Sequence, residues 1–301
     1  MLHTSNTLAL EVRRNTALPL ELAPDLRKVR ELQETNTAEV LAFLTVRPVH
    51  TVVMTSFIND NGIVSELNRG KFYGFRNAQG VLEGVALIGH TTLVEARTDE
   101  ALKAFAFVAK SAETPIHLIM SSGDTAHTFW NYLSDGLSQP RLVCVERLFE
   151  ATFPFLIQSP VSGLRKAEAS ELLQVAEAQA EVAFIESGSD PMLRDREGFL
   201  RRVARRIEQG RVFVVFDGDK LVFKADLMAE TDDVAYLEGV FVGHDYRGQG
   251  IGSKCLAALT VELLSRVAHV CLLSNVDFES AHRSFERAGF RSSDECTTLF
   301  I

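Results

Sequence analysis

The sequence has few of the features that mark secreted, membrane-spanning or metal-binding proteins. Its 301 residues include four cysteines, eight prolines and one tryptophan. The cysteines follow no metal-ligand spacing, so we expect them to be reduced and mostly buried, and we expect no metal site. No apolar run approaches the roughly 20 residues of a membrane span. Residues 1–14 lack a basic start followed by an apolar core, so we expect no secretory signal. The cysteines are Cys144, Cys255, Cys271 and Cys296.

Positive charge is also scarce. The chain has 31 lysines and arginines against 40 acidic residues, a formal net charge of −9. This balance argues against nucleic acid as the main partner and is compatible with a cationic substrate such as an amine. The motifs G-x-S-x-G, H-E-x-x-H and G-K-[ST] are missing, which argues against the enzymes that they mark. Together these absences predict a cytoplasmic protein with no membrane or nucleic-acid partner.

The most informative feature that is present is the glycine-rich stretch Tyr246–Gly252. It follows a run of strand composition at 234–242 and precedes apolar residues at helical spacing from Ile251 to Val267. Glycines let a ligand approach the backbone, and the N-terminus of a helix favours an anion. The pattern therefore predicts a phosphate-binding turn between a strand and a helix.

Prolines near Phe153–Pro160 divide the chain into two halves, which we predict to be domains at 1–155 and 160–301. In the second half, apolar periodicity and turn residues predict the order β-α-α-β-β-β-α-β-α-β. The Asp217-Gly218-Asp219 turn between two β-rich runs predicts a hairpin.

This order and its motifs resemble the GNAT superfamily of acyl-CoA-dependent N-acyltransferases, over about residues 160 to 301. The R/Q-x-x-G-x-G/A signature is similar to Arg247–Gly252, and a late helix followed by Gly-Phe is similar to the segment ending at Gly289-Phe290. The resemblance implies an α/β (α+β) fold with a mixed, mostly antiparallel sheet flanked by helices.

The first half echoes the second without its signature. We expect helices at 40–44, 51–58, 99–110 and 125–133 and strands at 71–75, 81–88, 116–120 and 141–145. The segment Thr91–Glu100, which we read as the counterpart of the cofactor loop, has no glycine and carries three acidic residues that would repel a pyrophosphate. Our hypothesis is a degenerate, cofactor-free copy of the same fold in tandem. An unrelated α/β cap is the alternative.

The resemblance also implies an acetyl-CoA site and no metal. Backbone groups of the glycine turn would hold the pyrophosphate, and the strand before it would pair with the pantetheine arm. The implied cofactor-binding residues are Val240, Phe241, Val242, Arg247, Gly248, Gln249, Gly250, Ile251, Gly252, Asn275 and Phe285.

Glu238 and Asn275 are the candidate catalytic residues. Strand alternation places Glu238 on the face of Val240 and Val242, where the acetyl group is expected. A carboxylate in an apolar strand suggests a general base or an anchor for a cationic substrate. A carboxylate facing solvent or an arginine at a strand end is the alternative. Asn275 could bind the pantetheine or a water, or be a plain turn residue.

The chain departs from its relatives at Phe285, where many have a tyrosine that protonates the departing thiolate. Ser284, Tyr246 or a water could replace it, the thiolate could leave unaided, or the site could be weakened. Lys224 and Asp226 could form a pair beside the site or lie on a solvated face. A run of arginines either forms a solvated helix face or contacts an anionic substrate or the 3′-phosphate of CoA. They are Arg194, Arg196, Arg201, Arg202, Arg205 and Arg206.

We therefore predict an N-acetyltransferase that uses acetyl-CoA to acetylate a primary amine of a small molecule or peptide. Direct attack is favoured because no cysteine is expected near the site. The acceptor would enter from Ser187–Arg196 and the groove between the halves. The alternatives are a non-catalytic acyl-CoA-binding or interaction module, and an acyltransferase that uses another acyl-CoA or an aminothiol acceptor. Assembly as a homodimer is left open.

Overall fold

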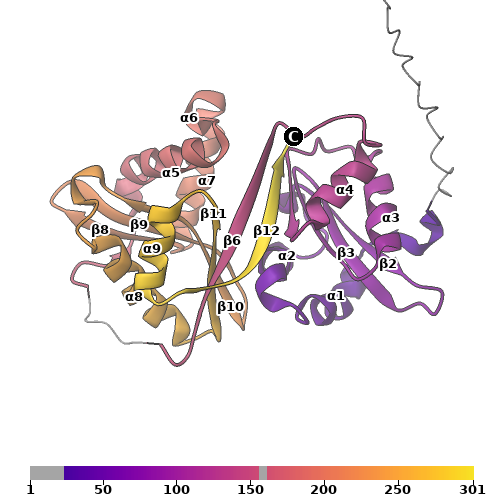
Figure 1. The fold of residues 1–301 in the computed structure, drawn as a ribbon, viewed down its shortest axis with the longest axis horizontal. Coiled ribbons are helices and arrows are strands. Elements are labelled where there is room, and N and C mark those ends of the chain that lie inside the picture. Colours follow the sequence, from indigo (N-terminus) through magenta and orange to yellow (C-terminus); the bar gives the residue numbers. More distant parts are fainter. Residues whose placement is uncertain (1–23, 156–160) are drawn as a thin grey trace, which may run out of the picture.

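The computed structural model describes residues 24–155 and 161–301 of the chain (Figure 1). The expectation of no secretory signal in residues 1–14, and the Ser159–Pro160 end of the predicted boundary, lie outside the described residues. Within that part of the chain, no helix is long and apolar enough to cross a membrane.

The described residues fold into helices and strands that alternate along both halves. The helices are α1 (Thr37–Leu44), α2 (Pro48–Asn61), α3 (Asp99–Ala109), α4 (Thr125–Leu133), α5 (Leu172–Ser187), α6 (Pro191–Arg194), α7 (Arg196–Glu208), α8 (Ile251–Leu264) and α9 (Glu279–Ala288). The strands are β1 (Val29–Glu31), β2 (Gly70–Arg76), β3 (Leu82–Gly89), β4 (Thr91–Ala96), β5 (Leu118–Ser122), β6 (Leu142–Thr152), β7 (Arg165–Lys166), β8 (Val212–Asp217), β9 (Lys220–Glu230), β10 (Val234–Val242), β11 (His269–Asn275) and β12 (Arg291–Phe300).

All twelve of these strands belong to one sheet. Its order is β1-β2-β3-β4-β5-β12-β6-β11-β10-β9-β8-β7. The pairs β4–β5 and β10–β11 are parallel and the other neighbours are antiparallel. This mixed, mostly antiparallel sheet flanked by helices confirms the predicted fold class.

The two halves exchange their last strands. β12, from the C-terminal half, lies between β5 and β6 of the N-terminal half, and β6 in turn pairs with β11 of the C-terminal half. These long strands run side by side in the middle of the molecule (Figure 1). Residues 142–152 and 291–300 therefore complete a sheet that neither half completes with its own strands.

The central strands separate in both halves. β10 pairs with β11 only from Val234 to Leu237, although β10 continues to Val242 and β11 to Asn275. β4 pairs with β5 only over Thr91–Leu93 and then continues to Ala96. The same separation at equivalent strands supports the proposal that the N-terminal half is a second copy of the fold.

The predicted element order of the C-terminal half is confirmed, with the short helix α6 in addition, and each predicted helix and strand of the first half is present. The strand predicted at 141–145 continues to Thr152, and β1 was not predicted. The prediction for Thr91–Glu100 was wrong. We predicted a loop, but Thr91–Ala96 is strand β4, and α3 begins at Asp99. The run Thr-Thr-Leu-Val has high β-propensity and pairs on both sides, with β3 and β5.

The buried apolar residues form several cores. α8 and α9 pack against β8–β11 and β6, while α5 and α7 pack against β8. α1 and α2 of the N-terminal half pack against strands of both halves, including Tyr236 on β10 and Cys271 on β11. This shared core fixes α2 beside the strands that separate in the C-terminal half.

Candidate active site

The predicted phosphate-binding turn lies between β10 and α8. Gly248 and Gly250 both have a φ of +75°, a conformation that L side chains rarely adopt. A Cβ at either position would find no protein atom within 4 Å, so the space in front of the turn is open. α8 begins at Ile251, and the N–H groups of its first turn have no partners inside the helix. The turn thus has the backbone shape, the open approach and the helix dipole that suit an anion.

Side chains of the turn hold it in place. Arg247 Nε donates to the carbonyl of Val242 (2.9 Å), and Arg247 Nη2 donates to Glu181 Oε1 (2.9 Å). Gln249 Nε2 donates to the carbonyl of Asp245 (2.9 Å). His244 Nε2 lies 3.1 Å from Glu181 Oε2, and the exposed His244 is a surface residue of the turn. These contacts fix the loop and leave the glycine backbone free.

A β-bulge changes the face on which Glu238 lies. Two residues of β10, Gly239 and Val240, oppose one residue of β9, and Gly239 has a φ of +60°. Val240 and Val242 pack into the core under α8, whereas Glu238 pairs with Asp226 on the opposite face. Our prediction that Glu238 shares a face with Val240 and Val242 is therefore wrong, because the extra residue breaks the alternation of side chains.

Beyond Leu237 no strand pairs with the β11 side of β10 in the described residues, so backbone groups of Glu238–Val242 are available there. Phe241, in contrast, faces α5 and lies 5.6 Å beneath the Arg247 guanidinium. Its side chain thus supports the turn from behind. The roles of Val240, Phe241 and Val242 in binding acetyl-CoA stay predictions.

Glu238 opens into a cavity of about 280 Å³ between the two halves, which we call the central cavity. Its wall comes from strands on both sides of the exchange and from α2 and α5. The lining residues are Val53, Phe57, Thr91, Leu118, Met120, Cys144, Glu146, Gln179, Ala183, Glu186, Ser187, Met228, Tyr236, Glu238, Leu273, Asn275, Thr298 and Phe300. The structure thus brings Glu238 and Asn275 together at the point where β10 and β11 separate.

Lys224 and Asp226 form a buried ion pair, not a solvated face. Lys224 Nζ lies 2.9 Å from Asp226 Oδ1, and their side chains are 0% and 3% exposed. Arg206 Nη1 donates to Asp226 Oδ2 (2.7 Å), and Lys224 also donates to Gln179 and to the carbonyl of Gly239. This cluster lies beside Glu238 and carries one net positive charge. Burial lowers the pKa of Lys224, and the Asp226 carboxylate opposes that shift.

Three carboxyl groups in the central cavity are difficult to ionise. Desolvation raises the pKa of Glu238, and Arg206 partly offsets this effect. Desolvation raises the pKa of Glu146 to about 7, with a further contribution from Glu238. The pKa of Glu186 is raised to about 8 by desolvation and by repulsion from Glu238 and Glu146. The site therefore has acid and base groups that titrate near neutral pH.

Glu146 and Glu186 were not predicted as site residues. Nothing in the sequence around either residue signals the role, because Glu146 lies on the exchanged strand β6 and Glu186 in the last turn of α5. Only the topology brings them to Glu238.

Our expectation that no cysteine lies near the site is wrong. Cys144, on β6, lines the central cavity and interacts with the Asn275 side chain. Burial and the neighbouring carboxylates raise the pKa of Cys144 to about 11, which keeps the thiol protonated and weakly nucleophilic. All four cysteines are free and buried, as predicted.

Four residues named in the sequence analysis lie in different surroundings: Phe285, the two candidate proton donors Tyr246 and Ser284, and Asn275. Phe285 is buried and lies edge-on to Phe149, with ring centroids 5.5 Å apart. Tyr246 donates to Asp217 (2.9 Å) on the neighbouring hairpin. Ser284 Oγ lies 3.7 Å from the position that a Cβ on Gly252 would take, so it faces the start of α8. Asn275 Oδ1 accepts from the Asp277 N–H (2.9 Å), the contact of a turn residue.

The six arginines of the run differ in their exposure to solvent. Arg206 faces inward to Asp226, and the other five are exposed, which agrees with a solvated helix face for them. Arg201 and Arg202 reach only Glu197 and Asp195, at 3.7 and 3.5 Å.

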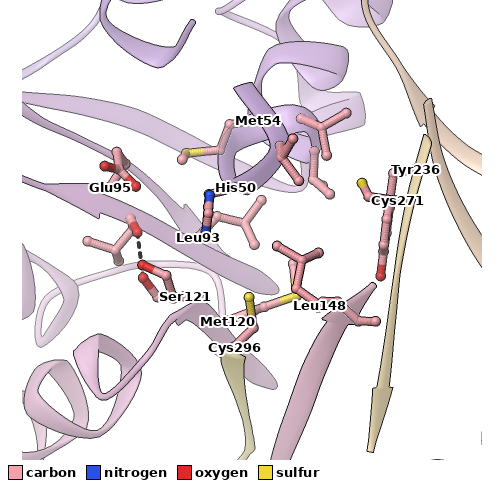
Figure 2. Close-up of a pocket in the computed structure, with 16 residues that line it drawn as sticks. His50, Met54, Leu93, Glu95, Met120, Ser121, Leu148, Tyr236, Cys271 and Cys296 are labelled. Atoms are coloured by element: carbon pink, nitrogen blue, oxygen red, sulfur yellow. Dashed lines mark hydrogen bonds between the residues drawn. The ribbon is translucent and has the colours of Figure 1, made fainter. Parts of the chain in front are cut away.

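A second, smaller cavity of about 40 Å³ lies where β4 and β5 separate, and we call it the His50 cavity. His50 and Glu95 lie on one side of it and Tyr236 and Cys271 on the other (Figure 2). Ser121 Oγ donates to the carbonyl of Val94 (2.8 Å) and so bridges the gap between the two strands (Figure 2). Thr98 caps α3 by accepting from the Ala101 N–H. These contacts support the proposal that this half has no cofactor loop.

The fold and the glycine turn are the features that the resemblance implied. Residues 208–292 match the family described as Acetyltransferase (GNAT) domain, so the C-terminal half carries a GNAT acyltransferase domain. This match confirms the resemblance found in the sequence. No curated protein matches the chain.

Solved structures share the fold over both halves. An acetyltransferase of the GNAT family from Colwellia psychrerythraea is 15% identical, with a TM-score of 0.57 over 91% of this chain and 99% of that one. A Drosophila protein is 11% identical, with a TM-score of 0.66 over 91% and 98%. A tandem GNAT protein from the clavulanic acid biosynthesis pathway is 12% identical, with a TM-score of 0.55 over 90% and 98%.

Proposed function

We propose that the protein is an N-acetyltransferase that transfers an acetyl group from acetyl-CoA to a primary amine of a small molecule or peptide by direct attack. The observation that carries this proposal is the position of Glu238. Glu238 lies on β10, the strand that leads into the glycine turn, and lines the central cavity at the point where β10 separates from β11. An acceptor in the cavity and an acyl group held along β10 would meet there.

The residues present fit acetyl-CoA. Gly248 and Gly250 offer an open turn for the pyrophosphate, and no strand of the described part of the chain pairs with Glu238–Val242 on the side facing β11. When bound, acetyl-CoA supplies a thioester that is activated toward nucleophiles. Acetyl is the acyl group that the match to the acetyltransferase family favours.

Glu238 is suited to the base role. An amine is protonated near neutral pH and must lose a proton before it attacks, and Glu238, with its raised pKa, is a matched acceptor. The amine nitrogen then bonds to the acyl carbon, the carbon–sulfur bond breaks, and the thiolate takes up a proton. Phe285 has no proton to donate to the thiolate. The proposed donor is either the Ser284 hydroxyl, which faces the start of α8, or a water.

Cofactor binding is tested first. Thermal unfolding with and without acetyl-CoA is measured for the wild type, for Gly250→Glu and for Gly218→Glu. Gly218 also has a positive φ and open space around it, but lies in the β8–β9 hairpin, so it controls for strain. Acetyl-CoA at one hundred times its dissociation constant should stabilise the wild type and Gly218→Glu by about 2.7 kcal/mol and Gly250→Glu much less. No stabilisation of the wild type would contradict the cofactor site.

Turnover is tested by the release of free thiol from acetyl-CoA across a panel of amines. Glu238→Gln should lower kcat by roughly 10²- to 10⁴-fold and leave acetyl-CoA binding intact. Glu262→Gln, a matched change of an exposed residue on α8, should have no effect. Phe285 favours the second candidate, a non-catalytic acyl-CoA-binding module. Binding of acetyl-CoA without thiol release for any amine would support that module.

A further inference from the structure

Three elements each contribute one carboxylate to the central cavity, and these carboxylates are not equivalent. Glu238 on β10 has the cationic pair of Arg206 and Lys224 beside it, which favours its ionised form. Glu146 on β6 accepts a hydrogen bond from the Thr298 hydroxyl (2.6 Å). Glu186 on α5 forms no ion pair within residues 24–155 and 161–301, and the largest influences on its carboxyl group are burial and the neighbouring Glu238 and Glu146. Among the described residues, neither Glu146 nor Glu186 therefore has an ion-pair partner that would favour its charged form.

Glu146 and Glu186 lie close together. Cys144 lies two residues before Glu146, on the same face of β6. Its Sγ atom is 3.7 Å from the backbone carbonyl oxygen of Glu186. Glu186 is in the last turn of α5, where the helix dipole is negative and a carboxylate is unfavourable. Arg141 donates to the carbonyl of Ser187 next to it (3.1 Å), not to either carboxylate. A cation bound here would relieve both the repulsion and the adverse dipole.

Tyr236 is an independent sign that a polar ligand enters the central cavity. It is 7% exposed and lines the cavity two residues before Glu238 on the same face of β10. No described residue hydrogen-bonds its hydroxyl. A buried tyrosine hydroxyl ordinarily has a partner, so this one is available to a ligand or a water.

The wall of the cavity is mostly apolar apart from these groups. Phe57 from α2, Met228 from β9 and Leu273 from β11 all contribute to it. Such side chains suit the hydrocarbon part of a ligand.

We propose that the acceptor is a small diamine, with one amine beside Glu238 and a second ammonium held by Glu146 and Glu186. The hydrocarbon spacer contacts the apolar wall, and the Tyr236 hydroxyl is a further hydrogen-bond acceptor. This inference rests on the proposed function, because it names the acceptor of the same reaction. The exchanged strand β6 thereby supplies part of the specificity pocket of the C-terminal half.

The test compares 1,3- to 1,6-diaminoalkanes with n-alkylamines of the same chain length. Thiol release and calorimetric binding in the presence of CoA are measured for the wild type, Glu146→Gln, Glu186→Gln and the Glu262→Gln control. We expect one or more diamines to exceed their matched monoamines roughly ten- to hundredfold in kcat/KM, the range of charge-assisted hydrogen bonds. Glu146→Gln and Glu186→Gln should each remove most of this preference, whereas Glu262→Gln should keep it.

Equal kcat/KM for diamines and monoamines would overturn the inference and leave the proposed function standing. A preference that survives both substitutions would overturn it as well. If acetyl-CoA binds but no amine reacts, the catalytic proposal fails, and calorimetry then decides the inference. Diamine binding that weakens at least tenfold in either glutamine variant supports the cation site, and equal weak binding of both amine classes refutes it.

Discussion

Removing the carboxylate between the two buried cations should have a large effect on stability. Asp226 lies between Lys224 and Arg206, at 2.9 and 2.7 Å, and the Lys224 side chain is fully buried. Asp226→Asn keeps the shape and leaves two positive charges without their counter-ion. Removing one partner of a buried pair costs about 3–5 kcal/mol, and we expect a loss in that range for the free energy of unfolding.

The loss should also depend on pH. Burial lowers the pKa of Lys224 and Asp226 raises it, so the substitution lowers it further. In the folded variant Lys224 then loses its proton at a pH where the unfolded chain still binds it. Because the unfolded state binds more protons in that window, the stability of the variant should rise as pH rises toward the ordinary lysine pKa.

Urea unfolding followed by circular dichroism at several pH values measures both effects. Lys224→Met in the Asp226→Asn background should recover much of the loss, because it removes one unpaired charge. Asp245→Asn breaks the exposed pair of Asp245 with Lys220 and should leave unfolding unchanged. A loss below about 1 kcal/mol for Asp226→Asn, or one that Lys224→Met does not reduce, would refute the reasoning.

Three further predictions concern single residues. Gly239→Ala should lower the free energy of unfolding by at least about 1–2 kcal/mol, because the φ of Gly239 is +60° and the new Cβ would lie 2.3 Å from Gln179 Oε1. An unchanged midpoint of urea unfolding would contradict the bulge. Glu146→Gln should stabilise the protein increasingly from pH 4.5 to about 7, since the raised pKa means that ionisation costs folding energy in that window. The limit is about 3–4 kcal/mol, because the pKa rises from 4.5 to about 7 and each pH unit corresponds to about 1.4 kcal/mol. A pH-independent effect in thermal scans would count against it. Gly248→Ala should cost about 1 kcal/mol of stability and weaken acetyl-CoA binding in calorimetry, and unchanged affinity would place the phosphates elsewhere.

The parts of the fold that depend on local pattern could be predicted from the sequence. The helical spacing from Ile251 onward and the hairpin at Gly218 identified their elements directly. The Thr91–Glu100 segment was misassigned because the comparison with the glycine turn outweighed the β-propensity of its threonines. Gly239 within a strand pattern could have signalled the bulge that changes the face of Glu238.

The parts that depend on distant pairing could not be predicted. Nothing near Glu146 indicates that its strand joins β11, more than 110 residues away along the chain, because register between distant strands depends on the whole sheet. Cys144 and Glu186 reach the central cavity for the same reason. The prediction therefore named candidates on β10, on the glycine turn and at the end of β11, and missed the residues that reach the cavity from β6 and from the end of α5.

The position of β12 has a consequence for how the chain reaches its native state during synthesis. Strands β5 and β6 are made before residue 153, but they are joined only through residues 291–300. While the ribosome is still adding the C-terminal half, the first half exposes two unpaired strand edges, the kind of surface that invites aggregation or pairing with another chain. The last strand to be translated is the one that covers them, so assembly of the central sheet is necessarily a late, long-range event.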